Sequence, residues 1–364
     1  MRAERIVARG FRNLADLDLS LPSGGAVFLG PNGHGKTNLL ELLYYPVLFR
    51  SLRGARDAQV ACHGEAGFSL SLTLANGRRP HELAAGFSLA GKQKRLTLDG
   101  AAPERMSEAI GHWLAVAFLP TDLRLVQGPA AGRRQYLDRV LSLADRAYLR
   151  ALTRYRGAVA QRNAALRQRR PELAAAFDLA LASAGAELVR RRLAWVRECA
   201  GRFAEECEGL GERESLAIGY RGDEALAEAE RWPAALSRAA ARDEALGMTT
   251  VGPHRHDLEL RLGGRMLREV GSTGQQRTAA VALKLCERET LAAASGSEPA
   301  LLLDDVFAEL DRDRRGRLAA RLAGGAPQTF ITSPREDELP EAFHLAALSV
   351  EQGRVTDRLG QLVA

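Results

Sequence analysis

Hydrophobic and polar residues alternate in two segments near the start of the chain. Leucine or phenylalanine occupies every second position over residues 17–21 and 68–74, with polar residues between. This period of two is typical of a strand with one buried face. Asn76-Gly77 and Asp99-Gly100 are turn signals of the kind that join antiparallel strands. We therefore expect residues 1–100 to form mostly strands, many of them antiparallel, with one helix packed among them.

The pattern then becomes helical. Residues 113–119 predict a last buried strand, and Pro120 ends it. Beyond it, apolar residues fall on one helical face over residues 172–208, and Pro171 suits the first turn of such a helix. At 1.5 Å per residue this helix would span roughly 55 Å. We expect a mostly helical insert over residues 120–245.

Strand signals return after the insert. Residues 300–303 are apolar on both faces, as expected of a central strand in a parallel sheet. The other expected elements are strands at 249–251, 258–262 and 328–332, a turn at 263–264, and helices at 275–291 and from about residue 313. The predicted fold class is α/β. Residues 1–119 and 246–364 would form a lobe with a mixed β-sheet, and residues 120–245 a helical second lobe.

One glycine-rich segment lies between an apolar run at 26–29 and a helical pattern that starts at Thr37. Its residues are Gly30, Pro31, Asn32, Gly33, His34, Gly35, Lys36 and Thr37. They fit G-x-x-x-x-G-K-[ST], a loop whose backbone N–H groups surround phosphate. Lys36 would reach the β- and γ-phosphates, and the Thr37 hydroxyl would hold Mg²⁺. A chance match in a glycine-rich turn is disfavoured, because strand and helix both stand in register. The sequence therefore predicts a site for ATP and Mg²⁺.

Two acidic residues follow the buried run at 300–303. Asp304 ends that strand, where a carboxylate holds Mg²⁺ directly or through water. Asp305 stands where a general base for the attacking water would be. Aspartate is one methylene shorter than glutamate, so we expect slow hydrolysis, no faster than about 1 per second. The alternative for Asp305 is a helix cap or turn residue.

A second anion site is predicted at the start of the helix near residue 275. Ser272, Gly274 and Gln275 offer a hydroxyl, N–H groups and a helix dipole. One chain cannot easily direct two helix N-termini at one γ-phosphate. We therefore expect this element to serve the ATP of a second copy, in an ATP-dependent homodimer. The alternative is an ordinary capped helix.

The charge balance points to a polyanionic partner. Net charge is +6 and the pI is about 9.4. Residues 146–170 contain eight arginines and no acidic residue. Their guanidinium groups suit phosphate, which makes them candidate DNA contacts. The candidates are Arg146, Arg150, Arg154 and Arg162, with Arg190, Arg191 and Arg192 as a further cluster. The alternatives are a solvated helix face, or arginines paired with glutamates of a neighbouring helix.

Cysteine usage and hydropathy favour a cytoplasmic protein. The four cysteines contain no C-x-x-C pair and are expected to be small buried hydrophobes in a reducing compartment. No apolar run approaches the roughly 20 residues of a membrane helix, and the first residues lack the apolar stretch of a signal peptide. His254 and His256 make a weak metal pair and are expected to have a structural or interface role.

Taken in order, these motifs resemble the ATP-binding-cassette (ABC) superfamily in its chromosome-maintenance, SMC-like branch, and within it the RecF family of recombination mediators. Glu309-Leu310-Asp311 resembles the D-loop of that superfamily. The resemblance is carried by residues 11–14, 30–41, 50–53, 118–123, 133–138, 161–163, 252–255, 272–278 and 301–311.

The resemblance implies an ABC-ATPase head without a long coiled coil. It also implies an ATP-dependent DNA-binding protein of DNA replication, recombinational repair and replication-fork maintenance. Similar proteins dimerise on ATP, bind single-stranded, gapped or junction DNA and hydrolyse ATP slowly in a DNA-dependent way. They help RecO and RecR to load recombinase, and they support the SOS response.

The sequence departs from other ABC proteins at two positions. Thr332 and Ser333 stand where transporters have a switch histidine, and the Q-loop glutamine is either Gln127 or replaced by Asp122. A transporter subunit is disfavoured because it would need that histidine and a shorter insert. A nuclease-associated ATPase would call for an acidic metal domain. A DNA clamp that scarcely hydrolyses ATP stays open. Arg12 and Asn13 are further candidate contacts of the nucleotide.

Overall fold

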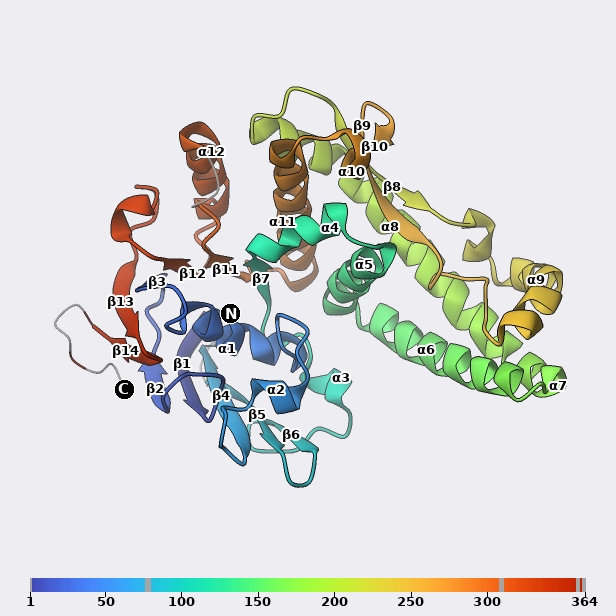
Figure 1. The fold of residues 1–364 in the computed structure, drawn as a ribbon, viewed down its shortest axis with the longest axis horizontal. Helices are drawn as coiled ribbons and strands as arrows, with labels where there is room; N and C mark the ends of the chain where they lie inside the picture. Colours follow the sequence, from blue (N-terminus) through green and yellow to red (C-terminus); the bar gives the residue numbers. More distant parts are fainter. Residues whose placement is uncertain (1, 76–79, 308–310, 358–360, 362–364) are drawn as a thin grey trace. The chain divides into compact units, whose positions relative to one another are not determined.

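The computed structural model describes residues 2–75, 80–307, 311–357 and 361. The chain divides into two compact units, which are described separately (Figure 1). Unit 1 contains residues 1–121 and 287–364, and unit 2 contains residues 122–286. The Asn76-Gly77 turn and the first two residues of the D-loop motif, Glu309 and Leu310, lie outside the described residues.

The central sheet of unit 1 has six strands in the order β14-β13-β3-β12-β11-β7. All but β14 run parallel. The strands are β3 (Gly25–Leu29), β7 (Ala115–Phe118), β11 (Ala300–Asp304), β12 (Thr329–Ser333), β13 (Ala346–Glu351) and β14 (Arg354–Thr356). β7, β11 and β12 are buried along their whole length, as expected of central strands in a parallel sheet. Strands β3 and β11, which precede the two predicted parts of the nucleotide site, are separated only by β12.

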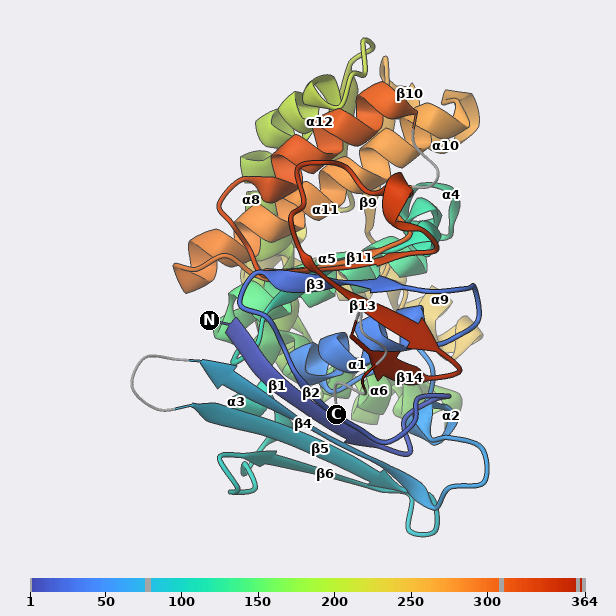
Figure 2. The same ribbon diagram turned by 90° about the vertical axis from the view of Figure 1, so that its left-hand side faces the viewer.

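A second, antiparallel sheet in unit 1 has the order β2-β1-β4-β5-β6. Its strands are β1 (Arg2–Arg9), β2 (Leu17–Ser20), β4 (Gly67–Ala75), β5 (His81–Ser88) and β6 (Gln93–Leu98). Helix α1 (Lys36–Leu48) lies between the two sheets and packs on both (Figure 2). The shorter helices are α2 (Asp57–Val60), α3 (Met106–Ala109) and α12 (Arg312–Ala323). The alternation of residues 17–21 and 68–74 therefore gave strands, as predicted.

Unit 2 is mostly helical. Its helices are α4 (Arg124–Gln127), α5 (Ala130–Ala144), α6 (Arg146–Arg167), α7 (Pro171–Ala175), α8 (Asp178–Gly209), α9 (Trp232–Leu246) and α10 (Leu267–Val270). Helix α11 (Thr273–Ser295) begins in unit 2 and ends in unit 1. The sheet β10-β9-β8 joins Arg265–Met266, Asp257–Leu262 and Leu216–Arg221. Among the described residues the longest helix, α8, has 32 residues, so no long coiled coil is seen there.

The second unit boundary lies later than the sequence predicted. Residues 246–286 were expected in the nucleotide-binding lobe but belong to unit 2. The reason is that β9 pairs along its length with β8, and the first turns of α11 contribute Ala279 and Leu283 to the apolar core of unit 2. The first boundary, at residue 121, agrees with the expected boundary within two residues.

Two element predictions were also wrong. The helix expected over residues 172–208 is interrupted between α7 and α8, because α7 packs separately on α6 through Ala174. The strand expected at 249–251 is absent. Thr249 and Thr250 instead donate backbone N–H groups to the side chains of Asn163 and Asp243.

Candidate nucleotide-binding site

The P-loop leaves the end of β3 and enters α1. Gly30 has a φ of +152°, and a Cβ there would lie 2.1 Å from the carbonyl oxygen of Val350 on β13. Gly35 has a φ of +112° and immediately precedes α1. Only glycine adopts such angles at low cost, so both positions need it. The loop is therefore tightly fitted between two strands, with its helix N-terminus beside it.

Lys36 points back over this loop and is only 4% exposed. Its Nζ donates to the carbonyl oxygens of Gly30 and Pro31, at 2.6 and 3.1 Å, and to Asn32 Oδ1 at 3.3 Å. These contacts hold a full positive charge among the backbone groups of the loop. The position is suited to an anion bound in the same loop.

Four side chains from α1, β11 and β12 meet at the carboxyl ends of the strands. The Thr37 hydroxyl donates to Asp304 Oδ1 at 2.8 Å, and the Thr332 hydroxyl donates to the same oxygen at 2.9 Å. Thr332 also accepts a hydrogen bond from the backbone N–H of Asp305 at 3.0 Å. Thr37 and Asp304, which the sequence predicted to share one site, are therefore in direct contact although 267 positions separate them.

Asp305 has an unusual backbone and an altered acidity. Its φ of +47° lies in the left-handed region, which is uncommon for non-glycine residues but is adopted by aspartate more often than by most. Burial, followed by the negative charge of Asp304, raises the pKa of the Asp305 carboxyl, and Lys36 opposes the shift. A carboxylate with a raised pKa is a better proton acceptor, which suits a general base. Sparsely populated backbone angles of this kind often occur at functional sites.

Neighbouring segments support the loop from two sides. Asn13 Nδ2 donates to the carbonyl oxygen of Gly33 at 3.3 Å, so this candidate nucleotide contact touches the loop itself. The turn between β13 and β14 touches it too, because the Gly353 N–H donates to the carbonyl oxygen of His34 at 2.9 Å. A Cβ on Gly353 would lie 2.0 Å from the carbonyl oxygen of Asn13. The turn, Asn13 and the loop are therefore closely packed.

Arg12 belongs to a buried charge cluster behind the loop. It makes a bidentate ion pair with Glu41 of α1, with both distances 2.9 Å. Arg53 and Ser51 also donate to Glu41, which has no exposed surface. Although burial opposes the shift, these hydrogen bonds hold the pKa of Glu41 below its usual value. Arg12 thus fixes α1.

The element at Ser272 forms the N-terminus of α11, in unit 2. Gln275 N–H donates to Ser272 Oγ at 3.2 Å, and Ser272 N–H donates to Gln275 Oε1 at 2.9 Å. This reciprocal capping box is the alternative that the sequence left open. Ser272 remains exposed on the surface of unit 2. Gln127, one of the Q-loop candidates, donates to Gln276 Oε1 at 2.7 Å in the same unit.

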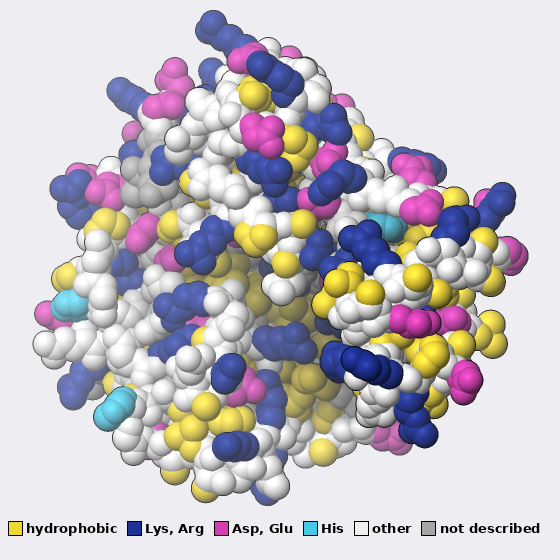
Figure 3. Space-filling model, turned by 45° about the vertical axis from the view of Figure 1, so that its right-hand side comes forward, with side chains coloured by type: hydrophobic (Ala, Val, Ile, Leu, Met, Phe, Trp, Pro, Cys, Tyr) yellow, Lys and Arg dark blue, Asp and Glu magenta, His cyan; other side chains and the backbone are white. Residues whose placement is uncertain are grey.

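The candidate DNA contacts on α6 divide into two kinds. Arg146, Arg150 and Arg154 are exposed at a spacing of four residues, and no ion pair is seen for them among the described residues. Arg162, in contrast, is 4% exposed and pairs with Asp178 and Asp243. We therefore assign Arg162 a structural role in this conformation. Lys and Arg side chains lie at many places on the face in Figure 3, with acidic side chains between them.

The arginine cluster at 190–192 is mostly paired. Arg190 and Arg191 pair with Glu187 of their own helix, α8, rather than with glutamates of a neighbouring helix. Arg192 is buried and donates to Asp138 Oδ1 at 2.6 Å and to Tyr148 Oη at 2.9 Å. None of the three is therefore an obvious free cation for a phosphate.

The two histidines are structural, as expected. Tyr155 donates to His254 Nδ1 at 2.7 Å, and His254 Nε2 donates to the carbonyl oxygen of Thr249. Burial, followed by the charge of Arg192, lowers the pKa of His256 to about 4. The described residues contain no cluster of three or more His, Cys, Asp or Glu side chains placed to hold a metal. Of the four free cysteines only Cys62 is partly exposed.

Sequence comparison finds close relatives over nearly the whole chain. A "DNA replication and repair protein RecF" of Anaeromyxobacter sp. is 40% identical over 343 residues, which cover 92% of each chain. A protein of the same name from Synechococcus sp. is 35% identical over 363 residues, 95% of each chain. The chain belongs to the RecF family. No family model matches the sequence.

The structural comparison agrees with this assignment. A RecF–ATP structure, described as a recombination mediator of the RecFOR pathway, superimposes with a TM-score of 0.89 at 28% identity. It covers 98% of this chain and 97% of its own. An SMC head domain shares the fold, with a TM-score of 0.58 at 14% identity. The chain is therefore an ABC-type ATPase of the RecF family. In the part that the structure describes, no helix is long and apolar enough to cross a bilayer.

Sequence reasoning noticed Thr332 only as the residue in place of a switch histidine. Its contacts with Asp304 and Asp305 make it part of the candidate nucleotide site. The available signal was its place at the end of β12, the strand between the P-loop strand and the strand of Asp304. The turn at Gly353 was missed as well, since it carries no motif.

Proposed function

We propose that the chain is an ATP-dependent DNA-binding protein of recombinational repair and replication-fork maintenance, which closes as a homodimer around ATP and reopens on hydrolysis. The observation that carries the proposal is the contact of Thr37, Asp304 and Thr332 beside Asp305 and the P-loop. The RecF relatives and the RecF–ATP structure supply the context of repair and of ATP.

The donor set at Thr37 and Asp304 fits Mg²⁺. A hydroxyl and a carboxylate oxygen lie 2.8 Å apart, and hard oxygen ligands are those that this ion prefers. When bound with ATP, the ion would neutralise charge on the β- and γ-phosphates. Thr37 and Asp304 are the residues that would hold it. The neighbouring Lys36 adds a second positive charge from the protein itself.

The protein's own part in hydrolysis is mainly positioning. Lys36 and the backbone N–H groups of residues 32–37 hold the phosphates in place. Asp305 accepts the proton of the attacking water, and Thr332 fixes the direction of Asp304 and the backbone of Asp305. The short Asp305 side chain leaves room for a relayed water, so turnover is slow. Asp305→Asn should lose turnover and keep ATP-dependent dimerisation.

A second copy completes the site through its α11 N-terminus. Ser272, Gly274 and Gln275 are the residues assigned to the γ-phosphate of the partner's ATP. In support, Ser272 is exposed, and the first N–H groups of a helix have no partner within it. The capping box is compatible with this role, because it arranges the same turn from which the contact would be made.

DNA binding is assigned to the exposed arginines of α6. Arg146, Arg150 and Arg154 share one helical face and are available to phosphates. The ligand would be single-stranded, gapped or junction DNA. RecR- and RecO-type mediators would join the complex to load recombinase, in the cytoplasm, and the activity would support SOS induction.

Salt dependence of DNA binding tests this assignment. Binding of a gapped duplex is measured with ATP and Mg²⁺ over a series of salt concentrations. Arg150→Ala/Arg154→Ala should lower the log–log slope by about 1.8, at 0.9 per lost phosphate contact. Arg238→Ala/Arg242→Ala on α9 removes the same charge at the same spacing and is the matched control. An equal slope in wild type and the α6 variant would overturn the assignment.

A further inference from the structure

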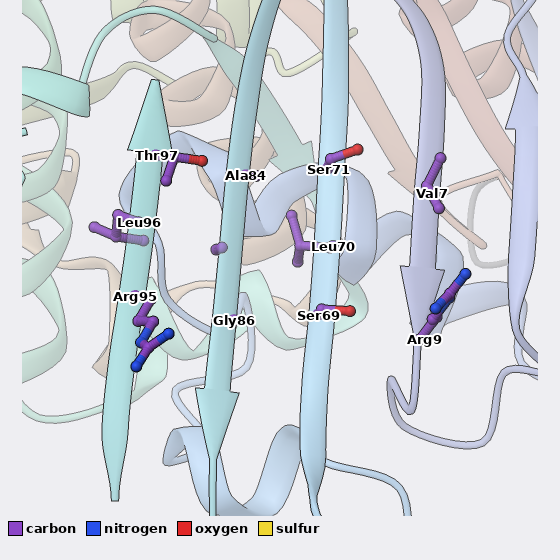
Figure 4. A pocket seen from close by; sticks show the side chains of 11 residues that line it. Val7, Arg9, Ser69, Leu70, Ser71, Ala84, Gly86, Arg95, Leu96 and Thr97 are labelled. Atoms are coloured by element: carbon purple, nitrogen blue, oxygen red, sulfur yellow. The ribbon is translucent and has the colours of Figure 1, made fainter. Parts of the chain in front are cut away.

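The antiparallel sheet of unit 1 has a hollow on one face. Its other face carries the apolar residues Ile6, Leu72 and Leu83 into the core. The hollow has a volume of about 400 Å³ and crosses β1, β4, β5 and β6. Figure 4 shows small side chains on its floor and arginines at its two sides. We call this surface, made of Arg9, Ser69, Ser71, Ala84, Gly86, Arg95 and Thr97, the sheet cradle.

Strand register places its key residues in one row. Arg9 is paired with Ser69, Ser69 with Gly86, and Gly86 with Arg95. The row therefore runs straight across four strands, with an arginine at each end (Figure 4). Three steps of about 4.8 Å between strands put the two arginine Cα atoms about 14 Å apart.

The floor between the arginines is low, and its mostly apolar lining carries the hydroxyl groups of Ser69 and Ser71. Gly86 has no side chain, and an added Cβ would meet nothing closer than 3.5 Å, so neither backbone strain nor crowding requires glycine there. Ser69 and Ser71 offer hydroxyl groups, while Ala84 adds little height. A wide, elongated ligand can therefore approach the backbone of the sheet closely at this point.

The charge of the cradle is positive and uncompensated. Arg9 and Arg95 are exposed, and the structure shows no ion pair for either among the described residues. None of the described residues that line the hollow is acidic. The nearest arginine along β1, Arg5, differs because it pairs with Asp18. The cradle therefore suits a polyanion rather than an acid-poor protein surface.

We propose that the sheet cradle binds the sugar–phosphate backbone of duplex DNA, as a second DNA contact besides α6. This inference rests on the DNA binding in the proposed function. Successive phosphates of a B-DNA strand wind around the helix axis, so their separation exceeds the axial rise of about 3.4 Å, and arginines about 14 Å apart can contact phosphates of one strand that are only a few nucleotides apart. The arginines hold those two phosphates, and the serine hydroxyls contact the backbone between them. Such contacts bind without reading sequence.

The test measures binding of a labelled duplex by the full chain, with ATP and Mg²⁺, over a series of salt concentrations. Arg9→Ala/Arg95→Ala should reduce the steepness of the plot of log affinity against log salt concentration by about 1.8. Arg9→Lys/Arg95→Lys keeps both charges and should keep the slope. Arg50→Ala/Arg317→Ala removes two exposed arginines of unit 1 that do not line the hollow and is the charge-matched control.

A steric variant tests the floor independently of charge. Ala84→Trp raises the middle of the cradle with a residue that strands favour, so folding is expected to survive and its melting temperature confirms this. Duplex affinity should fall at least about tenfold. If the wild type binds duplex DNA and both the Arg9/Arg95 and the Ala84 variants bind it with the same affinity and salt slope, the cradle is overturned and the proposed function is left intact. A wild-type chain that binds no DNA would overturn both.

Discussion

Replacing Thr332 with valine removes one hydroxyl from the centre of the nucleotide site. Thr332 is 1% exposed, and valine has nearly its shape. The variant would lose the 2.9 Å hydrogen bond to Asp304 and the acceptor for the Asp305 N–H at 3.0 Å. Among the described residues, the carboxylate of Asp304 would then keep the hydrogen bond from Thr37, and the backbone N–H of Asp305 would lose its acceptor.

The magnitude follows from these two bonds. A hydrogen bond to a charged group contributes about 1.5–3 kcal/mol, and a buried N–H without a partner costs about 1–3 kcal/mol. Part of this free energy also stabilises the ATP-bound state before the reaction, so the barrier rises by less than the sum of the two contributions. We expect turnover to fall by about 10- to 100-fold, equivalent to about 1.4–2.7 kcal/mol in the barrier. ATP affinity should change by less than about threefold, because Lys36 and the loop N–H groups are untouched.

Three measurements separate the effect from simple unfolding. Steady-state ATP hydrolysis with DNA gives turnover, binding of a non-hydrolysable ATP analogue gives affinity, and thermal unfolding gives stability. Thr332→Ser retains the hydroxyl and should keep turnover within about threefold of wild type. The reasoning is refuted if the valine variant is folded, binds the analogue and still turns over within about twofold of wild type.

Three further predictions concern residues whose roles the structure defines. Arg162→Met should destabilise the chain by about 3–5 kcal/mol in denaturant unfolding, because it leaves a fully buried carboxylate without its partner; unchanged stability with weaker DNA binding would contradict the structural role. The pKa of His256 is about 4 when folded and 6.5 in the unfolded reference, so its contribution is present above pH 6.5 and is lost as pH falls toward 4. At about 1.36 kcal/mol per pH unit this amounts to about 3 kcal/mol, and unfolding of His256→Gln should be less pH-dependent over that range; parallel curves would argue against it. Gly353→Val should raise the KM for ATP about tenfold or more by driving the β13–β14 turn away from the P-loop, and an unchanged KM would show that the turn does not support the loop.

Local sequence patterns were sufficient for much of unit 1. The alternation at 68–74 produced β4, and the apolar run at 300–303 produced the buried parallel strand β11. The P-loop could be recognised because its glycines, lysine and threonine act through one continuous stretch of backbone. Asp304 was found for a related reason, since a carboxylate at the end of a buried strand is costly unless a cation or hydrogen-bond donors compensate its charge.

Features that depend on distant partners were not predictable in the same way. Arg162 looked like its exposed neighbours on α6 because nothing local reveals that Asp178 and Asp243 approach it. The unit boundary was misplaced because the pairing of β9 with β8 spans the whole of α9 and its flanking loops. Thr332 carries no motif, and its role follows only from the order of strands in the sheet.

Sedimentation velocity tests the central proposal, ATP closure of a homodimer, most directly. The protein is examined with ATP–Mg²⁺, with ADP–Mg²⁺ and without nucleotide, each with and without a gapped duplex. The account predicts a dimer only with ATP, tighter DNA binding in that state, and loss of the dimer in both Lys36→Met and Ser272→Arg. An oligomer that forms equally without nucleotide, or a dimer that survives Ser272→Arg, would contradict it and confine the ATP site to a single chain.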